Sequence, residues 1–407
     1  MSKINIVIPV VKSNKFTGGP LCILEHAAQL TARGHDVRVI PVLPSPYPKW
    51  FKKNMGDFIS TKKTDTLKKS MKALFAAIKC IPSTKNESGK LKFIQHFGRF
   101  IENIGLTFPK FTPLSLRISL RIAHLREHMR DADITFATSY ETALPTALTG
   151  TGKLFYFIQH YEPYFKTESI DPFLTEKESL LSYKLGFKLI TNSQWLKKKI
   201  KQESNLENIA YCPNAINHEI FINKNNEKSV IDNNRIRIIS YGGRDAQWKG
   251  FKEMAEAVNI ARHTLPDIEI IWQVYGGALL PAHNDIAKYQ DLGFLSQEQL
   301  ATAYQNADIL LSASWYESFP LFPLEAMACG LAVISTQEGT ESFCIPGKTA
   351  EVVPARNPQA IAAAIINLIK NPSYRQQLSS NGNKKATTFT WKNAGNIMEN
   401  IIHTQTP

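Results

Sequence analysis

The amino-acid sequence predicts an α/β protein made of two Rossmann-like, doubly wound domains that face each other across a cleft. The chain has 407 residues, which is too long for a single domain, because a domain commonly has about 100–200 residues. Short apolar segments typical of buried parallel strands alternate with helical patterns along most of the chain. A polar stretch over residues 224–235 divides this alternation into two runs, and each run predicts one sheet covered by helices.

The first forty residues predict a strand, a glycine-containing loop, a helix and a second strand. Residues 4–10 are apolar enough for a buried strand, and Gly18 and Gly19 precede a helical stretch over 21–31. Residues 36–40 follow as the next strand. This βαβ opening places two glycines at a helix N-terminus, where backbone N–H groups can bind an anion. Further strands of the first run are expected at 133–137, 153–159 and 188–191, and Ser193 is expected to cap a helix.

The second run begins after the polar stretch, with a strand over 236–241. A loop containing Gly242, Gly243 and Gly250 follows it, and a helix is expected over 251–262. The remaining strands are expected at 269–275, 309–312 and 332–335.

The net charge of +13 is concentrated in one part of the chain. Residues 49–130 hold 18 Lys and Arg against 5 Asp and Glu, and this difference equals the whole excess. The pattern predicts a basic amphipathic helix whose polar side could face anionic lipid headgroups, and an ordinary solvated helix explains it equally well. Nucleic acid is not expected as a partner, because no recognition module accompanies the charge. The helix would combine Lys62, Lys63, Lys68, Lys69 and Lys72 with Leu67, Met71, Leu74, Phe75 and Ile78.

The five cysteines are scattered and odd in number, which favours reduced thiols in a cytoplasmic protein over disulfides or a zinc site. The first apolar run is too short for a signal peptide and is interpreted as a strand. No apolar run reaches the roughly 18 residues of a membrane-spanning helix.

The densest cluster of candidate binding residues runs from Glu317 to Glu325, between a predicted strand and a predicted helix. A carboxylate accepts two hydroxyl hydrogen bonds, so it suits the vicinal diol of a ribose or hexose, and backbone N–H groups at the helix start can receive phosphate. The alternative is that Glu325 only balances the positive end of the helix dipole.

Two further loops carry candidate ligand-binding side chains. Arg244 and Lys249 follow the predicted strand that ends near Gly243, and together they suit a diphosphate. A solvated loop with two cations is the alternative. His160 follows the strand over 153–159, where ligands of open α/β sheets bind, although a structural histidine would also fit. Glu162 competes with it for an acid–base role.

Five motifs, by their residues and their order along the chain, resemble the retaining glycosyltransferase family 4, also called glycosyl transferases group 1, which has the GT-B fold. Glu317 and Glu325 match its E-x7-E motif, and Gly243-Arg244 with Lys249-Gly250 matches its pyrophosphate loop. The other matches are Asn214-Ala215-Ile216-Asn217 with Phe221, Asp291 to Ser296 with Leu300, and Phe389-Thr390-Trp391. The agreement favours the ligand-binding interpretations over their alternatives.

The resemblance implies a hexosyltransferase that uses a nucleotide-diphosphate-sugar as substrate, without a cofactor or metal. Glu325 would bind the ribose and Glu317 the transferred sugar, while Arg244 and Lys249 would stabilise the leaving diphosphate. His160 would contact the sugar. Glu317, His160, Arg244 and Lys249 are thus the implied catalytic residues. The other implied donor-binding positions are Gly18, Gly19, Gly243, Gly276, Phe294, Leu295, Phe319, Pro320, Leu321 and Glu325.

The resemblance also implies domain boundaries and a class of acceptor. Residues 1–213 would form the acceptor-side domain and 214–388 the donor-binding domain, with 389–407 as a helix that returns to the first. The acceptor would be a glycan or lipid-linked molecule in surface polysaccharide or lipopolysaccharide synthesis, at the inner face of the cytoplasmic membrane if the basic region binds lipid. The segment 158–165 is similar to rhamnosyl-transferring members.

Two departures and two other functions bear on this interpretation. Pro320 stands where many members have glycine, which removes one backbone donor, and Asn214 to Asn217 lacks the usual glycine and aspartate. A non-catalytic nucleotide-sugar-binding subunit is one alternative function. An NAD(P)-dependent oxidoreductase is another, but the first loop lacks G-x-G-x-x-G and no acidic residue ends the second strand.

Overall fold

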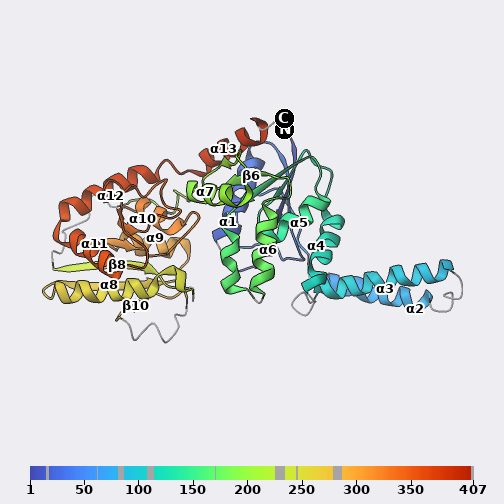
Figure 1. Ribbon diagram of the computed structural model, residues 1–407, viewed down its shortest axis with the longest axis horizontal. Helices are drawn as coiled ribbons and strands as arrows, with labels where there is room; N and C mark the ends of the chain where they lie inside the picture. Colours follow the sequence, from blue (N-terminus) through green and yellow to red (C-terminus); the bar gives the residue numbers. More distant parts are fainter. Residues whose placement is uncertain are drawn as a thin grey trace. The chain divides into compact units, whose positions relative to one another are not determined.

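The computed structural model describes residues 1–14, 18–61, 63–80, 87–107, 114–169, 171–224, 234–243, 246–277 and 287–404. The chain divides into two compact units (Figure 1). The first unit comprises Met1–Ile190, Ile200–Ala210 and Met398–Pro407, and the second comprises Thr191–Lys199 and Tyr211–Ile397.

The first unit is built around a seven-stranded sheet in the order β3-β2-β1-β4-β5-β6-β7. Its strands are β1 Lys3–Ile8, β2 Asp36–Pro41, β3 Asp57–Phe58, β4 Ile134–Ala137, β5 Lys153–Ile158, β6 Lys188–Thr191 and β7 Ala210–Tyr211. Its helices are α1 Gly18–Ala32, α2 Lys63–Cys80, α3 Glu87–Thr107, α4 Leu114–His128, α5 Tyr140–Thr149, the 3₁₀ helix η3 Glu162–Glu168, α6 Pro172–Ser182 and the end of α7 Gln194–Ser204, whose first part belongs to the second unit. Strand β1 pairs in parallel with β2 and β4, and β4 pairs in parallel with β5. Parallel neighbours need a crossover connection, which the helices provide.

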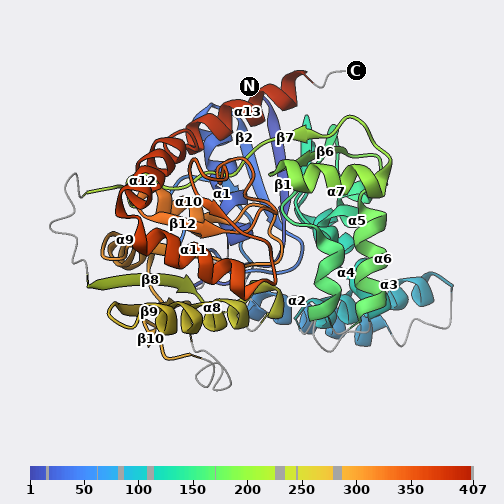
Figure 2. The same ribbon diagram turned by 60° about the vertical axis from the view of Figure 1, so that its left-hand side comes forward.

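The second unit repeats this architecture around a six-stranded parallel sheet in the order β10-β9-β8-β11-β12-β13. Its strands are β8 Arg235–Tyr241, β9 Glu269–Tyr275, β10 Gln290–Asp291, β11 Ile309–Leu311, β12 Ala332–Ser335 and β13 Glu351–Val352. Its helices are η4 Gln247–Lys249, α8 Phe251–Thr264, α9 Gln297–Gln305, α10 Leu321–Ala328, α11 Pro358–Lys370, α12 Pro372–Ala386 and the start of α13 Trp391–Thr404. Helices α8 and α11 lie side by side along this sheet (Figure 2).

Both faces of the second sheet are buried, which explains its continuous apolar strands. Ile238 belongs to the core shared with α8 and α11, whereas the next residue, Ile239, belongs to the core on the other face, with α9 and α10. Successive side chains of a strand point to opposite faces, so both faces require apolar residues.

The predicted doubly wound α/β class and the nine predicted strands are confirmed. The four two-residue strands β3, β7, β10 and β13 are additional. The first helix begins at Gly18 rather than at residue 21. The reason is that Pro20 falls in the first turn, where a helix needs no N–H hydrogen bond. Ser193 caps α7 as predicted, since its Oγ accepts the Leu196 N–H at 3.1 Å.

The predicted basic helix is present as α2, and the described part of the basic region also contains α3 and α4. Lys62 lies outside the described residues. Helices α2 and α3 pack side by side as a hairpin that projects from the first unit (Figure 1). No helix in the described part of the chain is both long and apolar enough to cross a membrane.

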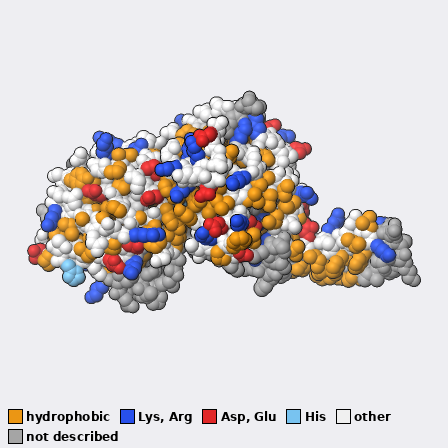
Figure 3. Space-filling model, in the orientation of Figure 1, with side chains coloured by type: hydrophobic (Ala, Val, Ile, Leu, Met, Phe, Trp, Pro, Cys, Tyr) orange, Lys and Arg blue, Asp and Glu red, His pale blue; other side chains and the backbone are white. Residues whose placement is uncertain are grey.

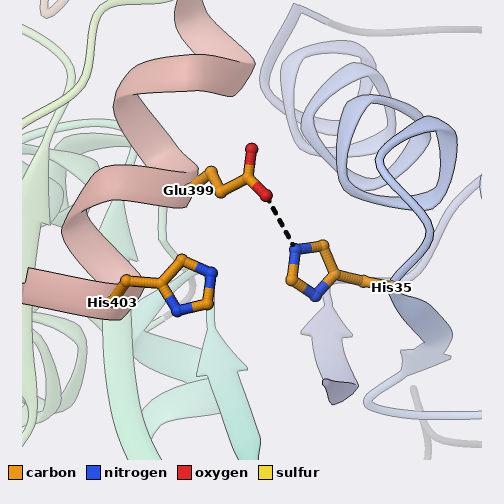
Figure 4. A group of neighbouring side chains, drawn as sticks. All are labelled: His35, Glu399 and His403. Carbon is orange, nitrogen blue, oxygen red and sulfur yellow. Dashed lines mark hydrogen bonds and ion pairs between the residues drawn. The ribbon is translucent and has the colours of Figure 1, made fainter. Parts of the chain in front are cut away.

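The end of α13 is held in the first unit by the side chain of Glu399 (Figure 4). Its carboxylate accepts hydrogen bonds from Arg33 Nε at 3.1 Å and His35 Nε2 at 3.4 Å. His403 lies beside them, and one ligand atom from each of His35, Glu399 and His403 falls within 4.8 Å of the others. The Ser2 N–H donates to His35 Nδ1 at 3.2 Å, so Nε2 carries the proton and has no lone pair for a metal. This bonding pattern fits an anchor for the helix.

Candidate active site

The second unit brings together the loops that follow β8 and β9 at the carboxyl edge of its sheet. A Cβ atom on Gly243 would lie 1.8 Å from the Gly276 carbonyl oxygen, so the two loops touch through their backbones. Gly276 also has a φ of +124°, which L side chains rarely adopt. Its N–H donates to Gly293 O at 2.8 Å, which adds the loop after β10 to the group. These glycines bring the backbones of three loops together at the edge where open α/β sheets bind ligands.

A buried ion pair joins two of the motifs. Lys249 Nζ lies 2.5 Å from Glu317 Oε1, and each side chain is only 11% exposed. Ser314 Oγ donates to the same carboxylate oxygen at 3.1 Å. The ammonium group also faces three aromatic rings, with its nitrogen 4.3 Å from the centre of Trp248, 5.5 Å from Phe322 and 5.7 Å from Tyr241. A cation with these neighbours is held in place and largely removed from bulk water.

Glycine again explains why these two residues, 68 positions apart, meet. Gly250 directly follows Lys249 with a φ of +69°, and a Cβ there would lie 2.0 Å from the Ala313 carbonyl oxygen. The Trp315 N–H donates to the Trp248 carbonyl at 2.7 Å. The loop after β11 therefore lies directly against η4, which carries Lys249 to Glu317.

Glu325 is a buried carboxyl group in α10. It is the fifth residue of this helix, beyond the first turn, so the alternative of a helix N-terminal acid is wrong. Burial raises the pKa of Glu325 from 4.5 to about 8. Burial raises the pKa of the Tyr275 and Tyr304 hydroxyl groups, and the nearby Glu325 carboxylate raises it further. The two hydroxyl oxygens are 2.7 Å apart.

The remaining predicted donor-side residues fall into different environments. The Phe319 ring packs into the core, with its centre 5.3 Å from that of Phe343, so only its backbone is available to a ligand. Pro320 precedes α10 and Leu321 begins it, which leaves the Leu321 N–H at the helix start. Phe294 is exposed, and Leu295 packs partly against the core. Arg244 lies outside the described residues.

The first unit holds the predicted acceptor-side residues. Gly18 and Gly19 begin α1, and a Cβ on either would meet nothing within 4 Å. His160 follows β5, with its ring stacked on Phe165 at 4.8 Å and its Nδ1 3.2 Å from Tyr161 O. Strands β1 and β5 lie on either side of β4, so their carboxyl ends are about 10 Å apart on one edge.

Glu162 has a structural environment rather than a catalytic one. Its carboxylate accepts the Tyr140 N–H at 2.9 and 3.0 Å and the Tyr156 hydroxyl group. Burial raises its pKa to about 8. These bonds join the loop after β5 to the start of α5, and they leave the half-buried His160 as the remaining candidate of this loop.

Sequence reasoning missed the partners that surround Lys249, namely Ser314 and the rings of Tyr241, Trp248 and Phe322. Tyr241, Trp248 and Phe322 lie inside or next to the motifs, so a run of aromatic residues around a single lysine was the available signal. Ser314 carried no signal, because its role depends on the approach of two loops.

Residues 221–385 match the family model described as glycosyl transferases group 1. The O-antigen biosynthesis protein RfbC of Myxococcus xanthus is 22% identical over 295 residues, covering 70% of this chain and 22% of that protein. The chain spans less than half the length of the first curated relatives that it matches.

Two solved structures share the whole fold. Sucrose-phosphate synthase of Thermosynechococcus elongatus has a TM-score of 0.70 at 17% identity, over 99% of both chains. Anabaena HepE, solved in complex with UDP-glucose, has a TM-score of 0.68 at 15% identity, over 99% of this chain and 100% of that one. Residues 221–385 are thus similar to the glycosyl transferases group 1 family, and the chain shares the GT-B fold of these solved structures.

Proposed function

We propose that the chain is a retaining glycosyltransferase that moves a sugar from a nucleoside-diphosphate-sugar to a glycan or lipid-linked acceptor. The observation that carries this proposal is the buried Lys249–Glu317 pair beside the glycine-lined loops of the second unit. The likeness to an O-antigen biosynthesis protein supports a place in surface polysaccharide or lipopolysaccharide synthesis.

Lys249 and Arg244 are proposed to bind the diphosphate and stabilise the charge that develops on it as the glycosidic bond breaks. An ammonium group has three N–H donors, and Glu317 takes one of them, which leaves two for phosphate oxygens. The surrounding rings lower the local dielectric, so the attraction to phosphate is stronger than in water. Resident cations can fill this role without a metal ion or cofactor.

Glu317 is proposed to hold the transferred sugar, and Glu325 the ribose hydroxyl groups. The Leu321 N–H at the start of α10 would add a backbone donor. Gly243 and Gly276 would let the donor approach the backbone, while Phe294 and Leu295 would contact the base. Gly18, Gly19 and His160 are proposed to serve the acceptor side and the sugar.

The donor can be identified by thermal unfolding with a panel of UDP-, GDP-, dTDP- and CDP-sugars. A true donor stabilises by mass action, by about 2.7 kcal/mol at a hundredfold excess over its Kd. UDP-glucose is the first arm, because HepE was solved with it, and dTDP-rhamnose is the second, because of the segment 158–165. NAD(P)H is included, and stabilisation by it alone would favour the oxidoreductase.

Turnover of the stabilising donor then tests the site. Glu317→Gln, or Lys249→Ala combined with Arg244→Ala, should lower transfer or donor hydrolysis by at least about a hundredfold, as loss of a preorganised electrostatic group does. Glu256→Gln and Lys252→Ala, both on α8, are matched surface controls and should leave turnover unchanged. Full turnover by Glu317→Gln would refute the site, and donor binding without any turnover would favour the non-catalytic subunit.

A further inference from the structure

The hairpin of α2 and α3 exposes large apolar side chains along both of its helices. On α2 the exposed residues follow helical spacing, and Phe75 is 59% exposed. On α3 they do the same, and Ile94 is 63% exposed. Figure 3 shows hydrophobic side chains gathered along this hairpin. The exposed set is Leu67, Met71, Phe75, Ile78, Leu91, Ile94, Phe97 and Ile101, and we call it the apolar stripe.

The side of α2 that is buried carries small residues instead. Thr66, Ser70 and Ala77 are 6%, 0% and 1% exposed, at spacings that place them on one side of the helix. Ser70 Oγ donates to the Phe100 carbonyl of α3 at 3.3 Å. A hairpin that folds in water normally buries its large apolar residues and exposes its polar ones. Helices that pack in lipid do the reverse, with small residues between them and large apolar residues outside.

The charge of the hairpin identifies the surface that could cover the stripe. Residues 63–107 hold nine Lys and Arg against three Asp and Glu, a net charge of +6. A second copy of the chain would bring the same positive charge to the contact, which disfavours self-association. An anionic lipid surface offers both opposite charge and an apolar interior, and long lysine side chains can reach its headgroups while their stems stay in the apolar layer.

We infer that the α2–α3 hairpin is an interfacial anchor that inserts its apolar stripe into an anionic membrane. Neither helix is apolar enough to span a bilayer, so the hairpin lies in the plane of the surface, as amphipathic helices do. Binding through insertion is partly independent of salt, whereas binding through attraction between charges alone would be lost as salt screens the charges. The inference does not depend on the transferase activity.

The test is co-sedimentation of the full chain with phosphatidylcholine vesicles, with and without phosphatidylglycerol, at low and high salt. The variant Phe75→Ser with Ile94→Ser should weaken binding to anionic vesicles at least about tenfold at both salt concentrations, because one large buried apolar side chain already exceeds that factor. Lys68→Gln with Lys72→Gln should weaken it at low salt only. Lys69 is left intact because it bonds to Glu127.

The matched control replaces exposed apolar residues elsewhere in the first unit. Leu148→Ser on α5 with Phe173→Ser on α6 removes side chains that are 57% and 71% exposed, and it should bind as the unchanged chain does. Equal melting temperatures would show that all variants fold, and light scattering would report self-association. The anchor is refuted if the unchanged chain ignores anionic vesicles, if the Phe75 and Ile94 variant binds them undiminished, or if that variant only dissociates a dimer.

Discussion

At the scale of single residues, the pair of Lys249 and Glu317 makes stability and function depend on each other. Both side chains are nearly buried, so removing one leaves the other as an uncompensated charge, which costs about 3–5 kcal/mol. We predict that Lys249→Met destabilises the chain by this amount in urea unfolding. Adding Glu317→Gln should recover part of the loss, because no buried charge then remains. Additive losses in the double variant would contradict the coupling of the two groups.

Glu325 predicts a pH dependence of stability. Its pKa is about 8 in the folded chain against an ordinary value of 4.5, so the folded state binds a proton more tightly than the unfolded state. Stability contributed by this group is therefore present below pH 4.5 and falls as pH rises toward 8. We predict that Glu325→Gln, which cannot ionise, gains in melting temperature over the unchanged chain across this range. A difference that stays constant with pH would show that burial does not set the ionisation of Glu325.

At the scale of elements, backbone contact between strand-end loops shapes the candidate site. Gly243→Ala would place a Cβ 1.8 Å from a carbonyl oxygen of the loop after β9, so one loop must move. We predict a loss of more than about 1 kcal/mol in unfolding free energy, as for other incompatible glycine replacements. Gly98→Ala is the control, because a Cβ there meets nothing within 4 Å and alanine favours helix α3. It should be neutral or stabilise by up to about 1 kcal/mol. Equal effects of the two variants would contradict the steric argument.

At the scale of the whole molecule, the chain has two units, each with its own sheet and core. A local defect in one unit should therefore leave the amide protons of the other unit protected from exchange. Gly152→Ala would set a Cβ 2.2 Å from the Asp133 carbonyl oxygen, between β4 and β5. We predict that it speeds amide hydrogen exchange in β4 and β5, whereas Gly243→Ala does so in β8 and β9. Faster exchange in both sheets from either variant would show that the two units unfold as one.

The sequence by itself determined the alternation of strands and helices and the residue types at the candidate site. Buried parallel strands are apolar on both faces, so segments such as Ile236 to Tyr241 stand out from the chain around them. The glycine pairs at strand ends can also be recognised from the neighbouring sequence alone. Two-residue strands such as β3 and β10 could not be predicted, because a pattern needs more than two positions.

Only the tertiary structure decided which neighbour each helix face or loop packs against. Met254, Val258 and Ala261 of α8 are buried, whereas Leu67, Met71 and Phe75 of α2 follow comparable helical spacing and face outward. The reason is that periodicity defines a face of a helix but not its neighbour. The pairing of Lys249 with Glu317 has the same origin, since two separate loops must meet before a carboxylate can hold a lysine.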